Sequence, residues 1–286
     1  MSERLAHRTG GADKILPDLM RAPDLAIESG CSLGHPMELL ATTTSTNDLA
    51  KRAARDGAPH GATWVAEQQT EGRGRRGHAW VCPRGEGLLF SVLVRLPFTP
   101  SRLPPIALAA GLAVRDVVAR AAPSAAVMVK WPNDVLIDDR KVAGVLVEAI
   151  LVGARVEALI LGVGVNVNTR DFPDPIAALA TSIALASSEP PDRAAILTDL
   201  LCAIDRDLHV VVGRGLGLLR ARIDAADVLR GRRVRGEGMG ESAFEQEGVA
   251  CGIDDDGRLL VRRSSGGAGG DNDLARWSAG EVHIVR

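Results

Sequence analysis

The stretch 142-VAGVLVEAILVGARVEALILGVGV-165 decides the fold of this chain. It contains two β-type runs, 142–150 and 156–165, joined by a link of only a few residues. Such a link allows a hairpin and is too short for a helical crossover, so we expect the two runs to pair antiparallel. The hairpin predicts a mixed, largely antiparallel sheet. Its three charged residues, Glu148, Arg155 and Glu157, exclude a membrane span.

Further regular patterns flank this hairpin. Strands are expected at 63–66, 88–95, 127–130 and 135–137, and helices at 105–121 and 192–212. Another helix is predicted to begin at Ser45, with acidic Asp48 in its first turn and a stop at Gly57. This alternation predicts an α+β domain, with helices flanking the sheet, over residues 37–229.

The two ends of the chain differ from this middle part. Beyond residue 229, short β-type runs at 233–235, 244–253, 258–263 and 281–286 are separated by a turn at 254–257 and a polar, Gly-rich loop at 264–273. They predict a small five- or six-stranded barrel over residues 230–286. Residues 1–36 are interrupted by Gly and Pro, and we expect a loosely held extension with at most one short helix, around 14–20.

The composition is that of an ordinary globular protein. The 286 residues are 46% hydrophobic and 24% charged, with a net charge of −2. No overall field attracts nucleic acid or a membrane surface, so an anion site needs a local basic cluster. The four cysteines show neither disulfide nor zinc spacing, and no targeting segment is visible, which favours a reducing cytoplasm.

The most distinctive local cluster is the Gly–Arg loop, Gly72-Arg-Gly-Arg-Arg-Gly77, with Gln69 just before it. It matches GxGxxG, but residues 78–83 do not open the helix that a dinucleotide fold requires, and no Walker A sequence is present. Guanidinium groups spaced by glycines suit a carboxylate and a phosphate held together. An isolated run of this kind is more often an RNA-binding segment or a solvated loop, so other residues must decide.

Three later motifs bear on that choice. Lys130-Trp-Pro-Asn-Asp134 ends a strand in a Pro-restricted turn, and Lys141 stands at the mouth of the apolar strand that contains Gly144. A lysine there is usually only a solvated strand end. Gly162-Val-Gly-Val-Asn166 leaves one face of a strand without side chains, which indicates either tight backbone packing or a flat ligand.

Together, Ser45-Thr46-Asn47, Gln69 with the Gly–Arg loop, the 130–134 motif, 141–148 and 162–168 resemble biotin–protein ligases in order and spacing over about residues 40–185. Residues 252–259 and 279–282 resemble the SH3-like barrel that ends these enzymes. The resemblance implies a biotin/lipoate ligase-like catalytic domain. It also implies an ATP-dependent reaction, with Mg²⁺, that forms biotinyl-5′-AMP and transfers biotin to a lysine of a biotin carboxyl carrier protein, that of acetyl-CoA carboxylase or of a related carboxylase.

The resemblance also implies roles for individual residues. Arg75 and Lys141 are expected to be catalytic, by neutralising charge at the carboxylate and the α-phosphate. The expected biotin contacts are Ser45, Thr46, Asn47, Gln69, Arg73, Gly74, Arg75, Lys141, Gly144, Leu146 and Gly162. The expected nucleotide contacts are Arg73, Arg75, Lys130, Asn133, Asp134, Gly164 and Asn166, and no direct motif for metal ligands is apparent.

Several alternatives stay open at this point. A lipoate or octanoate transferase shares the implied fold, although the Gly–Arg loop and the 130–134 motif favour biotin. A nucleic-acid-binding module would need a wider basic surface. A silent biotin sensor would lack Arg75 or Lys141, and both are present. Some family members carry an N-terminal DNA-binding domain, but only about 36 residues precede the catalytic region here, so we expect no operator binding. Dimerisation is left undecided.

Overall fold

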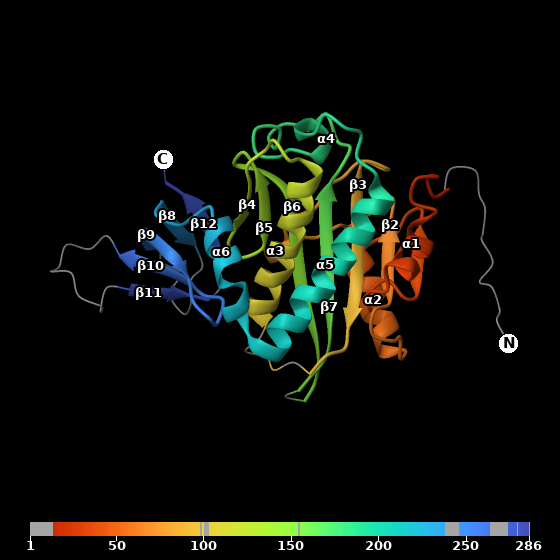
Figure 1. The fold of residues 1–286 in the computed structure, drawn as a ribbon, viewed down its shortest axis with the longest axis horizontal. Coiled ribbons are helices and arrows are strands. Elements are labelled where there is room, and N and C mark those ends of the chain that lie inside the picture. Colours follow the sequence, from red (N-terminus) through yellow and green to blue (C-terminus); the bar gives the residue numbers. More distant parts are fainter. Residues whose placement is uncertain are drawn as a thin grey trace.

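A seven-stranded mixed sheet forms the centre of the computed structural model (Figure 1). The structure describes residues 14–97, 99, 103–153, 155–237, 246–263, 274–278 and 280–285. The large sheet consists of β1 (Met37–Leu40), β2 (Thr63–Ala66), β3 (Gly87–Val94), β4 (Val127–Lys130), β5 (Asp134–Ile137), β6 (Arg140–Val152) and β7 (Arg155–Asn166), in the order β1-β2-β3-β7-β6-β5-β4.

The hairpin β6–β7 is the longest pairing of this sheet, and it confirms the predicted antiparallel pairing of residues 142–150 with residues 156–165. The two strands run antiparallel from Val152 opposite Arg155 to Ala143 opposite Val165. β1 and β2 are parallel, and the other pairings are antiparallel, so the sheet is mixed and largely antiparallel as expected. The register sets Gly144 opposite Gly164, which places two residues without side chains next to each other.

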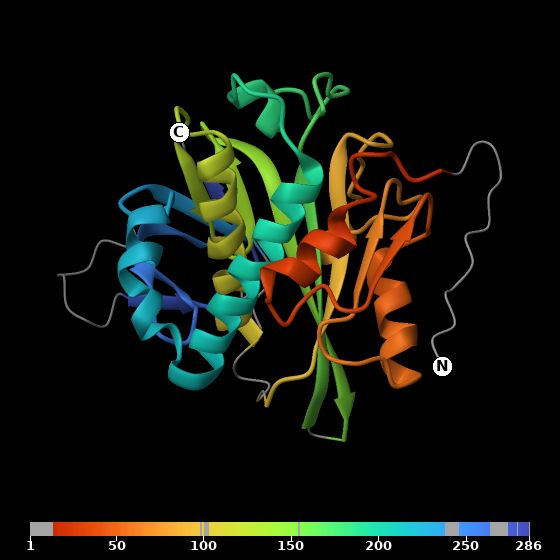
Figure 2. The same ribbon diagram turned by 45° about the vertical axis from the view of Figure 1, so that its right-hand side comes forward.

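Helices cover both faces of the large sheet. α3 (Leu103–Ala121) and α5 (Arg193–Arg214) lie against one face, and α1 (Ala22–Ser29) packs beside α5 (Figure 2). α2 (Thr46–Arg55) lies against the opposite face, where Ala50 and Ala54 meet a small apolar cluster that includes Trp64 and Ile160. Leu159 and Leu161, on either side of Ile160, point to the main core on the other face of the sheet. Successive side chains of a strand alternate between its two faces.

The C-terminal residues form a second, antiparallel sheet beside β4 and β5 (Figure 1). Short α4 (Ile183–Ala186), η3 (Leu216–Leu219) and α6 (Arg220–Ala226) precede it. Its strands are β8 (Arg233–Glu237), β9 (Gln246–Ile253), β10 (Leu259–Arg263), β11 (Leu274–Trp277) and β12 (Glu281–Ile284), in the order β11-β10-β9-β8-β12. The expected small all-β unit is confirmed, although β11 was not predicted. The polar loop 264–273 and, from the predicted strands and motif, residues 244, 245, 279 and 286 lie outside the described residues.

The side chain of Trp131 connects the two sheets. It is 2% exposed, and its Nε1 donates a hydrogen bond of 2.9 Å to the carbonyl oxygen of Gly257 in the turn before β10. Gly257 has φ +76°, and a Cβ atom added there would lie 2.9 Å from the backbone nitrogen of Pro105 in α3. The turn therefore fits closely against the large domain.

For residues 14–36 the prediction for the N-terminal segment was wrong in two respects, and residues 1–13 lie outside the described part of the chain. The helix lies at Ala22–Ser29 and not around 14–20, because Pro23 stands in its first turn and Gly30, at φ 70°, ends it. Leu19, Ala22, Ala26 and Leu33 are almost wholly buried in the main core, so the described part of this segment is firmly packed. No helix in the described part of the chain is long and apolar enough to cross a membrane.

Candidate active site

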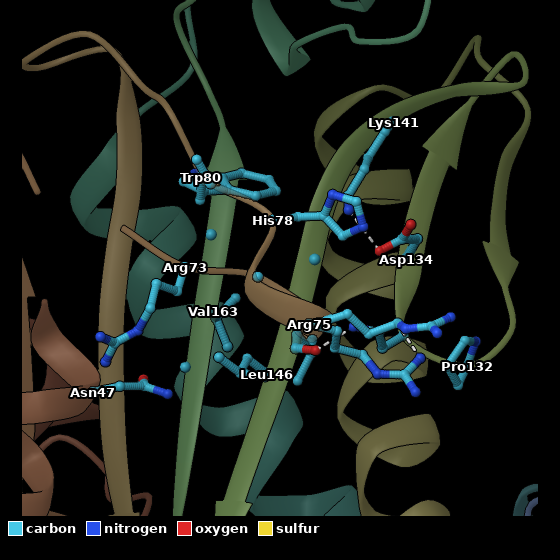
Figure 3. Close-up of a pocket in the computed structure, with 18 of the residues that line it drawn as sticks. Asn47, Arg73, Arg75, His78, Trp80, Pro132, Asp134, Lys141, Leu146 and Val163 are labelled. Carbon is cyan, nitrogen blue, oxygen red and sulfur yellow. Dashed lines mark hydrogen bonds and ion pairs between the residues drawn. The ribbon is translucent and has the colours of Figure 1, made fainter. Parts of the chain in front are cut away.

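A cavity of about 340 Å³ opens on the face of the large sheet that carries α2. Its walls come from the start of α2, the Gly–Arg loop, the β4–β5 turn, β6 and β7 (Figure 3). The start of β12 completes the lining. All but one of the residues implied by the resemblance line it: Ser45, Thr46, Asn47, Gln69, Arg73, Gly74, Arg75, Lys130, Asn133, Asp134, Lys141, Gly144, Leu146, Gly162 and Gly164.

Asn166 is the exception, because it does not belong to the cavity lining. Its side chain is buried, and Nδ2 donates a 3.0 Å hydrogen bond to the carbonyl oxygen of Thr181. The same segment pairs with Lys141, whose N–H donates to Leu179 and whose carbonyl accepts from Thr181. Asn166 thus fastens the segment that holds the backbone of Lys141.

The floor of the cavity is made of the glycines of β6 and β7. A Cβ atom on Gly162 would lie 2.2 Å from Oδ1 of Asn47, and one on Gly164 would lie 2.5 Å from the ring of Trp80. Both distances are far below van der Waals contact, so only glycine allows Asn47 and Trp80 to approach the sheet this closely. Figure 3 shows the Trp80 ring lying across β7.

A hydrogen-bonded polar group closes the α2 end of the cavity. Gln69 Oε1 accepts from the backbone N–H of Thr46 at 2.8 Å and from its hydroxyl at 3.2 Å. Ser91 donates to Oδ1 of Asn47 at 2.5 Å, and Nδ2 of Asn47 donates to Glu148 at 2.7 Å. Ser45 occupies the N-cap position, but its hydroxyl does not cap the helix. These buried, fixed groups suit the recognition of a small polar ring.

Arg75 and Lys141 bring two cations to the same cavity from separate parts of the chain (Figure 3). Nη1 of Arg75 donates to Oδ1 of Asn133 and to the carbonyl oxygen of Gly280, both at 3.4 Å. Burial lowers the pKa of the Arg75 guanidinium from its ordinary value, while the charge of Asp134 opposes this shift. An arginine nevertheless stays protonated at neutral pH.

Lys141 has two neighbours that hold its ammonium group. Its Nζ lies 2.7 Å from Oδ1 of Asp134 and 5.5 Å from the centre of the Trp80 ring. The carboxylate and the ring face both attract the ammonium group and hold it at the cavity wall. The lysine therefore offers a positive charge to an anion in the cavity, and Asp134 balances that charge when no anion is present.

The other arginines of the Gly–Arg loop point to different partners. Arg73 forms an ion pair with Asp48 of α2, and Arg76, with φ 55°, donates to the carbonyl oxygen of Glu237 at 3.2 Å. His78 lies 3.5 Å from Glu281. The loop is thus attached to α2 on one side and to the C-terminal sheet on the other, with Arg75 between them.

The β4–β5 turn is fixed by Asn133. Its Nδ2 donates to the carbonyl oxygen of Val145 at 2.5 Å, and the N–H of Val145 donates back to the carbonyl of Asn133 at 3.0 Å. These bonds hold the turn against β6 and set Asp134 beside Lys141.

Sequence reasoning did not predict several cavity residues. Trp80 follows the Gly–Arg loop, where a lone aromatic residue in a chain with only four tryptophans and no tyrosine was the available signal. Gly280, Glu281 and Val282 come from β12 and the residue before it. Their motif had indicated only the fold of the C-terminal unit, because nothing local indicates contact with a loop some 200 residues earlier in the chain.

Comparison with known proteins places this architecture in a family. Residues 39–166 match the model of the biotin/lipoate A/B protein ligase family, and residues 230–284 match that of the biotin protein ligase C terminal domain. The two matches coincide with the sheet that carries the cavity and with the small antiparallel sheet. The chain belongs to the biotin/lipoate A/B protein ligase family.

Individual relatives narrow this class to the biotin protein ligases. A biotin–[acetyl-CoA-carboxylase] ligase of Mycobacterium tuberculosis is 37% identical over 230 residues, 79% of this chain and 82% of the relative. A bifunctional ligase/repressor of Bacillus subtilis is 30% identical over 257 residues, 87% of this chain and 78% of the relative. The Aquifex aeolicus biotin protein ligase solved with biotin and ATP superimposes with a TM-score of 0.71 at 27% identity, covering 87% of this chain and 98% of that one.

Proposed function

We propose that this protein is an ATP-dependent biotin–protein ligase. It joins biotin and ATP to biotinyl-5′-AMP and pyrophosphate, and then transfers biotin to a specific lysine of a biotin carboxyl carrier protein, that of acetyl-CoA carboxylase or of a related carboxylase. The observation that carries the proposal is that Arg75 and Lys141, from separate segments, share one cavity with the polar group around Thr46 and Gln69.

The cavity suits the first half-reaction because its ends differ in chemistry. The polar group at the α2 end accommodates the ureido ring of biotin, Leu146 and the glycine floor accommodate the apolar tail, and the carboxylate then lies near the cations. Arg75 and Lys141 neutralise the carboxylate and the α-phosphate as a carboxylate oxygen bonds to the α-phosphorus and the bond to pyrophosphate breaks. Lys130, Asn133, Asp134 and Gly164 lie on the nucleotide side.

The second half-reaction needs mainly positioning. The acyl carbon of the mixed anhydride is already reactive, so the amine of the carrier lysine attacks it, AMP leaves and the amine loses a proton. A loop attached to both α2 and the C-terminal sheet keeps water from the intermediate until the carrier arrives.

Mg²⁺ belongs in this proposal to the substrate, MgATP. In such complexes the ligands of Mg²⁺ are phosphate oxygens, several waters and one or two carboxylates. Among the described lining residues Asp134 and Glu281 carry carboxylates, and we assign Asp134, beside Lys141, to the metal side. The described residues include no group of three or more His, Cys, Asp or Glu that could hold a metal ion by themselves.

The predicted boundaries form part of the proposal: a catalytic unit over residues 37–229 and a C-terminal barrel over 230–286. β1 begins at Met37, and β8 at Arg233, which supports both. The four cysteines are free, which supports a reducing location such as the cytoplasm.

A competition between acids tests the function most directly. Purified protein is incubated with ATP, Mg²⁺, labelled biotin and labelled lipoate, and pyrophosphate and each acyl-adenylate are followed, with and without a carrier protein. We expect pyrophosphate and acyl-adenylate only with biotin, and label on the carrier lysine. Preferential formation of lipoyl-adenylate would instead show that the protein activates lipoate and is not a biotin–protein ligase.

A further inference from the structure

An ion cluster with a buried central pair and a third member, Asp18, that is 43% exposed lies outside the cavity, at the base of the long loop between β2 and β3. Arg193, the first residue of α5, contacts Glu67 and Asp18. Its Nη1 is 2.6 Å from Oε2 of Glu67, and its Nε and Nη2 are each 2.7 Å from an oxygen of Asp18. The side chains of Arg193 and Glu67 are both 0% exposed.

The cluster joins the two ends of the β2–β3 loop, residues 67–86, which contains Gln69, the Gly–Arg loop and Trp80. Glu67 directly follows β2, and Nη1 of Arg193 also donates to the carbonyl oxygen of Gly87, the first residue of β3, at 3.2 Å. The β2–β3 pairing ends with Ala66 opposite Leu89, and beyond it a single long backbone hydrogen bond, from the N–H of Gly85 to the carbonyl oxygen of Glu67 at 3.3 Å, joins the loop ends among the described residues. Arg193 bridges the two strand ends there.

The N-terminal segment completes the cluster from outside. The N–H of Leu16 donates to Oε1 of Glu67 at 2.9 Å, and Arg84 donates to the carbonyl oxygen of Lys14. A Cβ atom on Gly85 would overlap the side chain of Leu16, so this segment lies tightly on the returning end of the loop. Figure 2 shows the segment, in red, passing the start of α5 and the end of β2.

The energetics favour a conformational role for this cluster. Desolvation of a buried ion pair largely cancels its attraction, so an apolar replacement of similar volume would hold the core as well. What an apolar side chain cannot reproduce is the set of five hydrogen bonds that Arg193 makes to Asp18, Glu67 and Gly87. These bonds fix the direction in which the loop leaves β2 and returns to β3.

The loop ends lie close in sequence to ligand-facing groups. Gln69, which holds Thr46 at 2.8 Å, is two residues beyond Glu67. On the returning side, Cys82 packs on Gly87 so closely that a Cβ atom there would be 2.5 Å from its Sγ, and Trp80 stands two residues earlier. A shift at the base therefore moves both the polar group and the aromatic wall.

We propose that Arg193 is a positioning residue for biotin and the adenylate: paired with Glu67, it fixes both ends of the β2–β3 loop in the geometry that retains the ligand. The inference rests on the proposed ligase function. It assigns to α5 and to the segment 14–19 a part in ligand retention, although neither lines the cavity.

The test compares Arg193→Met with Arg222→Met. Arg222 is a suitable control because it also bridges two carboxylates, Asp116 of α3 at 2.5 Å and Asp207 of α5 at 2.8 Å, and neither partner lines the cavity. Misplaced binding groups lower rates by up to about 100-fold, so we expect Arg193→Met to raise the KM for biotin and the rate of adenylate escape about 10- to 100-fold. The KM for the carrier should stay unchanged, and Arg222→Met should leave all three values within about twofold.

Glu67→Gln gives a second, nearly isosteric probe in case Arg193→Met does not fold. We expect it to change the same two quantities in the same direction, and the double variant to add little, because both changes break one connection. A folded Arg193→Met or Glu67→Gln protein with unchanged biotin KM and escape rate would overturn the proposal. If the unmutated protein activates lipoate instead, the proposed function fails, and the same comparison on lipoyl-adenylate decides the role of Arg193 separately.

Discussion

Arg75 reaches the cavity because its loop is attached on both sides, and within the described part of the chain its own side chain makes two long hydrogen bonds, both of 3.4 Å. Weak protein partners leave the guanidinium available to an anion. We expect Arg75→Ala to lower kcat/KM for adenylate formation by about 100- to 1000-fold, as the loss of a preorganised charge-stabilising donor does. We also expect it to release biotinyl-adenylate, which would biotinylate nearby lysines unselectively.

The measurement is a pyrophosphate assay together with mass spectrometry of an added bystander protein. Arg120→Ala is the control, because Arg120 forms an exposed pair with Asp199 and does not line the cavity. Adenylate held as tightly by the Arg75→Ala variant as by the unmutated protein would refute the expected leakage.

A second residue-scale prediction concerns Asp227, which has no part in the proposed chemistry. It is 7% exposed, and its Oδ2 has no hydrogen-bond partner in the described part of the chain. Burial raises the pKa of Asp227 above its ordinary value of 3.8, and the hydrogen bond from the backbone N–H of Leu229 opposes this shift without cancelling it. The folded protein therefore binds this proton more tightly than the unfolded chain does, and the free energy of unfolding falls as pH rises from the unfolded pKa through the folded one.

Asp227→Asn removes that ionisation. The difference in unfolding temperature between variant and unmutated protein should therefore shift in favour of the variant between pH 4 and pH 8. Calorimetry at both values measures it, with Asp199→Asn, an exposed carboxylate at the surface, as control. Equal differences at the two pH values would show that the carboxyl titrates alike in both states.

At the scale of elements, the glycines of β7 form the floor of the site. We expect Gly164→Ala to raise the KM values for biotin and ATP, because its Cβ would lie 2.5 Å from the Trp80 ring and displace it. Gly213→Ala is the matched control, since it lies in α5 with nothing within 4 Å. That change should leave both KM values intact and stabilise the helix by up to about 1 kcal/mol. Steady-state kinetics of both variants measure the KM values, and thermal melts measure their stability.

How far the sequence predicted these elements depended on length and on local signals. β6, β7, α3 and α5 were predicted within about two residues, because each shows a sustained apolar pattern. The four-residue β1 and β11 were missed because they contain no β-branched residue, unlike the equally short β2, β4 and β5, which were predicted. α1 was misplaced because its apolar residues Ala22 and Ala26 are small, and Pro23 and Gly30 were interpreted as interruptions rather than as its ends.

The cavity residues likewise divide into those that a local sequence pattern indicates and those that it does not. Motifs within one segment, such as Gly72–Gly77 and Lys130–Asp134, could be found, and the resemblance supplied their common site. The placement of Gly280 beside Arg75, or of Arg193 beneath the β2–β3 loop, depends on how distant elements pack. No local pattern encodes such contacts.

On the scale of the whole molecule, the two sheets form the cavity together. Residues 280–282 line it, and Arg75 and Arg76 donate to carbonyl oxygens of the C-terminal sheet and the residue before β12. We assign none of the described side chains of the C-terminal sheet to the proposed chemistry, so its expected contribution is to hold the Gly–Arg loop. A shift of the C-terminal sheet relative to the large domain should therefore change the rate of adenylate formation.

Gly257→Ala tests this dependence, with Gly231→Ala as its control. Both glycines have φ near +77°, at +76° and +78°, so both variants carry the same backbone strain. Only at Gly257 does the added Cβ also meet α3, 2.9 Å from the nitrogen of Pro105, next to the carbonyl that accepts from Trp131. We expect Gly257→Ala to slow adenylate formation about tenfold beyond any effect of Gly231→Ala, because displacement of the sheet misplaces Arg75. Equal rates in two folded variants would mean that the C-terminal sheet can shift without disturbing the loop, and that the contacts of Arg75 and Arg76 with it do not position the cation.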